Sequence, residues 1–165
     1  MPASTPLSTL LIHGRLASLG ITLKTVSAPT ANYVNFVRTG DLLHVCGHNP
    51  YRPDGSLVKG KLGDNLSVAQ GYDAAKFCAI SILATLEQAL GGDWSKLVRI
   101  VKLVGFCNST ADFTDHPSVI NGASDLLVAL LGPDVGSHAR SAVGMMSLPF
   151  GIAVEVECIV QVKGD

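Results

Sequence analysis

The segment from Val154 to Val162 alternates between two classes of residue, and this alternation constrains the fold more than any other feature of the chain. Successive side chains of a strand point to opposite faces of a sheet. Four valines and Cys158 would share one face, while Glu155 and Glu157 would lie on the other. We therefore expect a strand whose valine face packs against helices, and whose acidic face meets solvent or lines a site in an oligomer.

Local patterns predict the remaining elements. Two apolar runs flank residues 38–41 and predict a β-hairpin, in which Gly40 supplies a positive φ. Ser67 and Gln70 match a capping box at the start of a long helix, and Gly122 inside a later helix predicts close packing or ligand approach. The order β-β-α-β-α-β-β indicates an α+β fold, a mixed sheet with two main helices on one face. The predicted helices cover 8–20, 67–90 and 117–132, and the strands cover 33–37, 42–46, 98–107, 139–147 and 153–162. Residues 50–63 are expected to form an exposed loop with room for a short strand.

Length and composition limit the class of protein. At 165 residues the chain fits one domain, 1–165, with residues 1–30 as an N-terminal helical extension. It is 47% apolar and only 15% charged, which favours contacts with other subunits. Its longest apolar run, 141–154, is interrupted by Pro149 and Gly151, so we expect no membrane span. The N-terminal residues lack the charge and the apolar run of a signal peptide, so we expect a cytoplasmic protein.

Charge and cysteine usage argue against several other classes. Lys and Arg number 12 against 13 Asp and Glu, without a basic stripe, so nucleic-acid binding is not expected. The four cysteines are far apart in apolar surroundings, which predicts buried free thiols. His44 and His48 have the i, i+4 spacing but fall at a strand, where this spacing does not converge on a metal. We expect neither a metal nor a cofactor.

Three charged residues near the C-terminus are the candidates for chemistry. Arg140 presents five donors in a planar fork that matches a carboxylate, but a strand arginine paired with an acid would explain it equally simply. Glu155 could activate or hold a water, or balance Arg140, or lie on the surface. Glu157 shares its face and is interpreted as structural.

Further motifs around these residues resemble the YjgF/Rid family, also called the L-PSP endoribonuclease-like or reactive-intermediate deaminase family. The resemblance extends from about Tyr33 to the C-terminus, and its terminal block is the most specific part. The length of the chain and its N-terminal helix resemble a longer subgroup of the family. The motifs are Tyr33, Val45-Cys46-Gly47-His48-Asn49-Pro50, Asn121, His138-Ala139-Arg140-Ser141, Leu148-Pro149 and Val154-Glu155-Val156-Glu157.

The resemblance implies a chorismate-mutase-like fold that forms homotrimers with ligand pockets between subunits. It also implies hydrolysis of 2-imino or enamine acids to 2-keto acids and ammonia. In this family pattern Arg140 holds the ligand carboxylate, Glu155 handles the water, Tyr33 and Asn121 line the pocket, and the backbone of Gly47 lines it too. A small carboxylate, imino or keto acid, is the implied partner.

Two departures from the family pattern leave other functions open. The frequent cysteine two residues after the arginine is Ala142 here, and the glutamine after the glycine is His48, so the pocket is expected to differ. A trimeric protein that binds a small carboxylate without turnover is the main alternative. Endoribonuclease activity would need a phosphate-binding surface, and chorismate mutase activity follows only from fold analogy.

Overall fold

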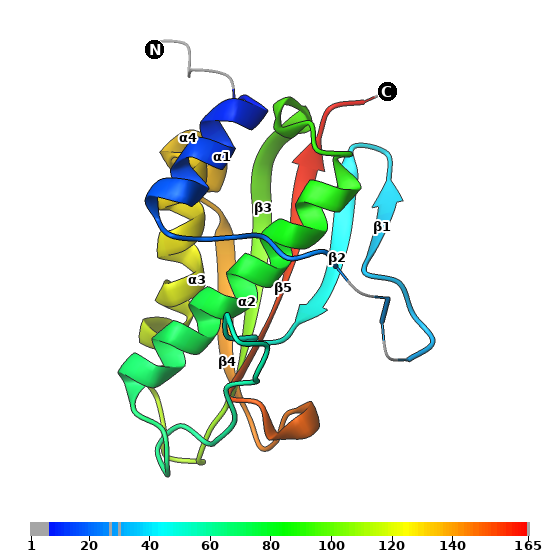
Figure 1. Ribbon diagram of the computed structural model, residues 1–165. Coiled ribbons are helices and arrows are strands. Elements are labelled where there is room, and N and C mark those ends of the chain that lie inside the picture. The colour runs from blue at the N-terminus through cyan, green and yellow to red at the C-terminus, as the bar shows by residue number, and fades with distance from the viewer. Residues whose placement is uncertain (1–6, 27, 30, 165) are drawn as a thin grey trace.

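The computed structural model describes residues 7–26, 28–29 and 31–164. Within them, five strands form one mixed sheet in the order β1-β2-β5-β3-β4, with β3 and β4 parallel and the other neighbours antiparallel. Helices α2 and α3 cover one face of the sheet (Figure 1), which confirms the predicted α+β architecture. The elements are α1 (Thr9–Ser18), β1 (Phe36–Thr39), β2 (Leu42–His48), α2 (Val68–Ala89), η1 (Trp94–Lys96), β3 (Leu97–Asn108), α3 (His116–Leu131), α4 (Pro133–Gly136), β4 (Ala139–Met145), η2 (Pro149–Gly151) and β5 (Val154–Val162).

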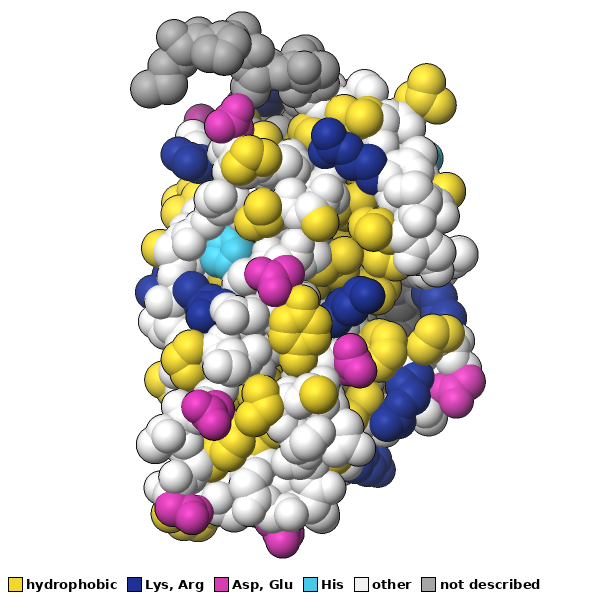
Figure 2. Space-filling model, turned by 90° about the vertical axis from the view of Figure 1, so that its left-hand side faces the viewer, with side chains coloured by type: hydrophobic (Ala, Val, Ile, Leu, Met, Phe, Trp, Pro, Cys, Tyr) yellow, Lys and Arg dark blue, Asp and Glu magenta, His cyan; other side chains and the backbone are white. Residues whose placement is uncertain are grey.

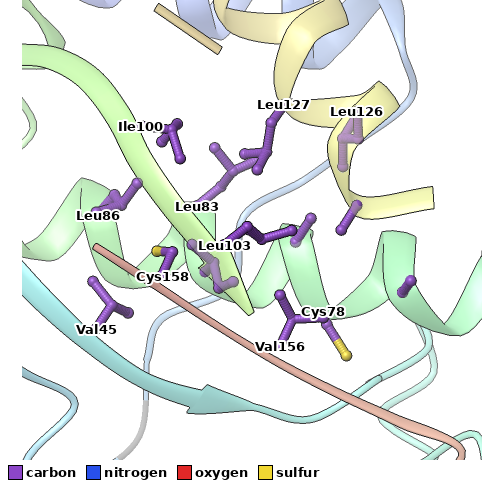
Figure 3. Close-up of a cluster of buried hydrophobic side chains, with 14 of the residues drawn as sticks. Val45, Cys78, Leu83, Leu86, Ile100, Leu103, Leu126, Leu127, Val156 and Cys158 are labelled. Carbon is purple, nitrogen blue, oxygen red and sulfur yellow. The ribbon is translucent and has the colours of Figure 1, made fainter. Parts of the chain in front are cut away.

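The alternation of β5 is confirmed in full. Its valines and Cys158 are buried, and the residues between them are half-buried on the opposite face. Figure 3 shows Val156 and Cys158 among side chains of the covering helices, such as Leu83 of α2 and Leu127 of α3. Because burying each valine side chain contributes about 1.5–3 kcal/mol, this face fixes β5 in the centre of the core.

Helix α2 begins with the predicted capping box. The Ser67 hydroxyl accepts from the Gln70 backbone N–H, and the Gln70 side chain accepts from the Ser67 backbone N–H. Along its length α2 packs tightly against α3, since a Cβ atom on Gly122 would collide with the backbone carbonyl oxygen of Tyr72. Of the two explanations predicted for Gly122, close packing is the one observed.

The β-hairpin forms, but its boundaries differ from the prediction. The first strand begins at Phe36 rather than at residue 33 and continues to Thr39, so Gly40 and Asp41 alone make the turn. Gly40 has the expected positive φ, 58°. The two-residue turn prevails because it matches the twist of antiparallel strands better than a four-residue connection.

The segment 50–63, predicted as an exposed loop with room for a short strand, is partly buried. Val58 and Leu62 are buried, and bridges join Lys59 to Ile152 and Leu62 to Ser109. These apolar residues cover the edge of the core next to Ser109 and Ile152. The glycine and proline content of the segment predicts turns but does not reveal this burial.

The face of the sheet opposite the helices carries apolar side chains. Val104, Phe106 and Ile159 are half-buried there, and Val143 of β4, beside Phe106, is 42% exposed. We refer to these four residues as the open face. In the part of the chain that the structure describes, no helix is both long and apolar enough to cross a membrane.

Candidate functional site

Arg140 lies on the helix-covered face of the sheet. It pairs with the buried Leu103 of β3, and neighbours in parallel register point to the same face. Its guanidinium donates to the Asn121 side chain at 2.8 Å, to the Ser124 hydroxyl at 3.0 Å and to the Pro117 carbonyl at 3.3 Å. These acceptors are uncharged oxygens, and no acid among the described residues forms an ion pair with Arg140.

The partners of Arg140 come from one face of α3. Asn121 and Ser124 are three residues apart, a spacing that places both side chains on the same side of a helix. Asn121 was predicted as a pocket residue, and the structure brings it into direct contact with Arg140. Ser124 was not predicted, although its i+3 position relative to Asn121 was the available signal.

Glu155 lies on the opposite face of the sheet, in register with Phe106 of β3. Its carboxylate packs over Gly47 of β2 so closely that a Cβ atom there would collide with Oε1. Burial raises the pKa of Glu155 above the ordinary 4.5, and the charge of Glu157 raises it further. Glu155 is therefore protonated more readily than a free glutamate and is suited to accept a proton from water.

A β-bulge creates the contact between Gly47 and Glu155. Val45 pairs with Cys158 and His48 with Val156, so Cys46 and Gly47 together oppose one residue of β5. The extra residue turns the backbone of Gly47 toward the acidic face, and glycine leaves room for the carboxylate. The family resemblance points to Gly47, but the bulge that gives it this position is visible only in the structure.

Glu157 has no ion-pair partner among the residues described. It lies on the same face as Glu155 and opposes the bulge, and its charge contributes to the raised pKa of both Glu155 and the Cys46 thiol. Its structural role stays a prediction; what the structure shows is a charge that acts on its neighbours.

The structure separates the predicted residues into two pairs and one outlier. Arg140 and Asn121 meet on the helix-covered face, and Gly47 and Glu155 meet on the open side. Tyr33 is 52% exposed just before β1, at the far edge of the sheet from β4 (Figure 1). One copy of the chain does not bring Arg140 and Glu155 to the same side of the sheet.

The two departures from the family motif both lie on the helix side. His48 is buried, with Nδ1 2.7 Å from the Cys46 carbonyl and Nε2 2.7 Å from the Thr85 hydroxyl of α2. Ala142 packs against the core. The bulge directs the His48 ring toward α2 and away from Glu155, so any effect of this residue on the pocket would come from the helix side.

Other features of the structure lie away from these residues. A groove of about 620 Å³ runs between α1, residues 21–26 and α2, and none of the predicted site residues lines it. All four cysteines are free, three of them buried and Cys46 half-buried. Within the described ranges, no three His, Cys, Asp or Glu side chains are grouped to hold a metal ion.

Comparison with known families identifies the family to which the chain belongs. Residues 13–162 match the family described as YjgF/chorismate mutase-like, putative endoribonuclease. The chain belongs to this YjgF/chorismate mutase-like family. The match covers the Arg140–Asn121 pair and the Gly47–Glu155 pair, so both halves of the candidate site lie on the family's fold.

Individual relatives agree with this assignment. The protein TCP17 of Trypanosoma cruzi is 43% identical over 92% of this chain and 94% of its own. The crystal structure of Atu1372 from Agrobacterium tumefaciens, a protein of unknown function, has 45% identity, a TM-score of 0.86, and coverage of 94% and 96%. TdcF of Escherichia coli, solved with bound serine, shares the fold at 20% identity and a TM-score of 0.60, with coverage of 86% and 96%.

Proposed function

We propose that this protein is a hydrolytic deaminase that converts 2-imino or enamine acids to 2-keto acids and ammonia. The observation that carries the proposal is the hydrogen bonding of the Arg140 guanidinium. Three of its five N–H donors are used on neutral oxygens, and two, at Nε and Nη2, have no partner among the described residues. A half-buried guanidinium with free donors and no internal carboxylate is suited to bind a ligand carboxylate.

The proposed site requires two copies of the chain. Since Arg140 and Glu155 lie on opposite faces of one sheet, the arginine of one copy would meet the glutamate of another. The apolar open face supports such an assembly, because exposed apolar patches beside polar groups mark subunit contacts. A homotrimer with ligand pockets between subunits is the arrangement that the family resemblance implies.

The chemistry follows from these groups. With the ligand carboxylate on Arg140, Tyr33 and the Gly47 backbone would position the imine carbon next to a water held by Glu155. Glu155 accepts a proton as the water oxygen bonds to carbon, and the C=N double bond becomes a single bond as the nitrogen takes up a proton from solvent, which gives a carbinolamine. Glu155 then returns its proton to this nitrogen, the C–N bond breaks and ammonia leaves, while the hydroxyl gives its proton to solvent as its oxygen becomes the carbonyl of the keto acid. Holding water and carbon in contact can contribute several kcal/mol.

Carboxylate binding without turnover is the second candidate function. The observation in its favour is that the Arg140 half of the site is complete in one copy, whereas catalysis also needs the Glu155 half from another. Ammonia release distinguishes the two functions.

Endoribonuclease activity, which the family description includes, is less well supported. In the view of Figure 2, Lys and Arg side chains are interspersed with acidic and hydrophobic ones. A phosphate backbone is bound by a continuous basic surface, so this view offers RNA little to bind.

The test measures ammonia release from 2-iminobutanoate generated in solution, together with 2-oxobutanoate binding by calorimetry. We expect Arg140→Ala to weaken keto-acid binding roughly 100-fold, since hydrogen bonds to charged groups contribute about 1.5–3 kcal/mol. Glu155→Gln should keep binding but abolish turnover. The control is Arg15→Ala, an arginine of α1 that donates to the Leu130 carbonyl.

Each outcome selects between the proposals. Normal turnover by Arg140→Ala or by Glu155→Gln would contradict the deaminase mechanism. Tight binding of 2-oxobutanoate by a wild-type protein that releases no ammonia would establish the binding function instead.

A further inference from the structure

Arg140, a serine and a histidine form a chain of hydrogen-bonded side chains, with the serine in the middle. The Ser124 hydroxyl oxygen is 3.0 Å from Nη1 of Arg140 and 3.0 Å from Nε2 of His138. The other ring nitrogen of His138, Nδ1, is 2.6 Å from the backbone carbonyl of Gly136. The three side chains come from β4, α3 and the segment just before β4, so only the packed fold brings them together.

The direction of each hydrogen bond follows from the carbonyl of Gly136. A carbonyl oxygen only accepts, so Nδ1 of His138 carries the hydrogen, and in the neutral ring Nε2 is then an acceptor. The Ser124 hydroxyl donates to Nε2, which leaves its oxygen lone pairs for Arg140. The chain of donors therefore runs from Arg140 to Ser124 and from Ser124 to His138.

The surroundings favour the neutral ring that this chain requires. Burial lowers the pKa of His138, the Gly136 carbonyl opposes this, and the charge of Arg140 lowers it further. Arg99 of β3 lines the same surface hollow as His138, so the other charged side chain near the ring is also a cation. The acid directly after Ser124 in α3, Asp125, accepts a hydrogen bond from Tyr72 of α2 instead.

We propose that Ser124 and His138 are positioning residues for Arg140 and thereby set its affinity for a ligand carboxylate. Neutral His138 fixes the Ser124 hydroxyl hydrogen, and the serine oxygen then holds Nη1, so that the free donors at Nε and Nη2 keep one direction. A neutral scaffold also leaves the full charge of Arg140 for the ligand, which an acidic partner would not. This inference rests on the proposed function, in which the guanidinium of Arg140 binds the ligand carboxylate; we call this contact the carboxylate clamp.

The experiment measures the dissociation constant for 2-oxobutanoate by calorimetry in the full-length protein. Ser124→Ala should weaken binding about tenfold, because a hydrogen bond that orients the guanidinium is lost. Ser118→Ala removes the same atom from an exposed position of α3 and should leave affinity unchanged. Thermal unfolding of each variant separates loss of affinity from loss of fold.

Two substitutions of His138 isolate its role. His138→Gln places an amide where Nε2 lies and can still accept from Ser124, so we expect affinity within about twofold of wild type. His138→Asn reaches the Gly136 carbonyl but not Ser124, and should weaken binding about as much as Ser124→Ala. The double variant Ser124→Ala/His138→Asn should be no weaker than either single variant, because both remove the same support.

The outcomes separate this inference from the proposed function. If 2-oxobutanoate binds the wild type and Arg140→Ala equally, the carboxylate clamp itself is wrong. If Arg140→Ala abolishes binding but Ser124→Ala and His138→Asn do not weaken it, the clamp stands and the positioning role is overturned. Equal losses in His138→Gln and His138→Asn would also overturn it, since they would reflect packing alone.

Discussion

At the scale of single residues, small differences in backbone path decide which side chains take part in the site. The bulge at Cys46 and Gly47 turns Gly47 toward Glu155 and His48 toward Thr85 of α2. His48 thus stabilises the bulge from the helix-covered face, because both of its ring nitrogens are hydrogen-bonded and its ring is buried. A motif that looks like a row of pocket residues in the sequence therefore divides between the two faces of the sheet.

The buried ring of His48 makes stability depend on pH. Burial lowers the pKa of His48 below the ordinary 6.5. As the pH falls through 6.5, the unfolded chain binds a proton at His48 that the folded protein does not, so the free energy of unfolding decreases until the folded-state pKa is passed. Above 6.5 the ring is neutral in both states and this contribution to stability is fully present.

We expect His48→Gln to lower the free energy of unfolding by about 1 kcal/mol at pH 7.5, because Gln cannot keep both hydrogen bonds. The same substitution should make stability less sensitive to pH between 7.5 and 5.5. Urea unfolding at both values measures the difference, with His44→Gln, an exposed position of β2, as the control. An unchanged pH dependence in His48→Gln would show that other groups cause it.

At the scale of elements, the contact between α2 and α3 positions the Arg140 half of the site. Asn121 and Ser124 belong to α3, and Gly122 between them lies against the α2 backbone at Tyr72. Any separation of the two helices would therefore shift the acceptors that hold Arg140. The glycine costs some intrinsic helix stability, which the close packing offsets.

Gly122→Ala should destabilise the protein by at least about 1–3 kcal/mol, because the new methyl group overlaps the Tyr72 carbonyl and pushes the helices apart. It should also weaken 2-oxobutanoate binding through Asn121 and Ser124. The matched control is Gly14→Ala in α1, where a Cβ atom meets nothing within 4 Å and helix propensity predicts a gain of about 0.5–1 kcal/mol. Equal effects of the two substitutions on thermal unfolding would contradict this view of the interface.

At the scale of the whole molecule, the two faces of the sheet have different partners. Helices cover the valine side of β5, whereas the open face carries apolar groups beside Glu155 and Glu157, which form no ion pair with any residue that the structure describes. The proposed trimer would cover this face and bring Arg140 of another copy, with the carboxylate of its ligand, close to Glu155.

A lysine at Val143, on the open face, should shift the protein from trimer to monomer, because a charge would be desolvated between subunits. Light scattering after gel filtration measures the mass, and ammonia release should fall with it. Leu10→Lys places the same charge on α1 at a residue that is 85% exposed, and should change neither property. A monomeric wild type, or a Val143→Lys protein that stays trimeric, would contradict the proposed assembly.

The sequence by itself determined the elements whose signals are local. The alternation of β5, the capping box of α2 and the positive φ of Gly40 all depend on neighbours within a few residues, and all three are observed. The family resemblance of its motifs also predicted Arg140 and Asn121 as candidate site residues, and the two side chains are in contact.

The tertiary structure alone decided which of these residues meet. An alternating pattern shows that a strand has two faces, but it does not tell which face of a distant strand lies beside it. Arg140 and Glu155 therefore looked like neighbours, yet strand register places them on opposite sides of the sheet. The Ser124–His138 pair and the bulge at Gly47 likewise depend on packing between segments far apart in the chain, which no local pattern encodes.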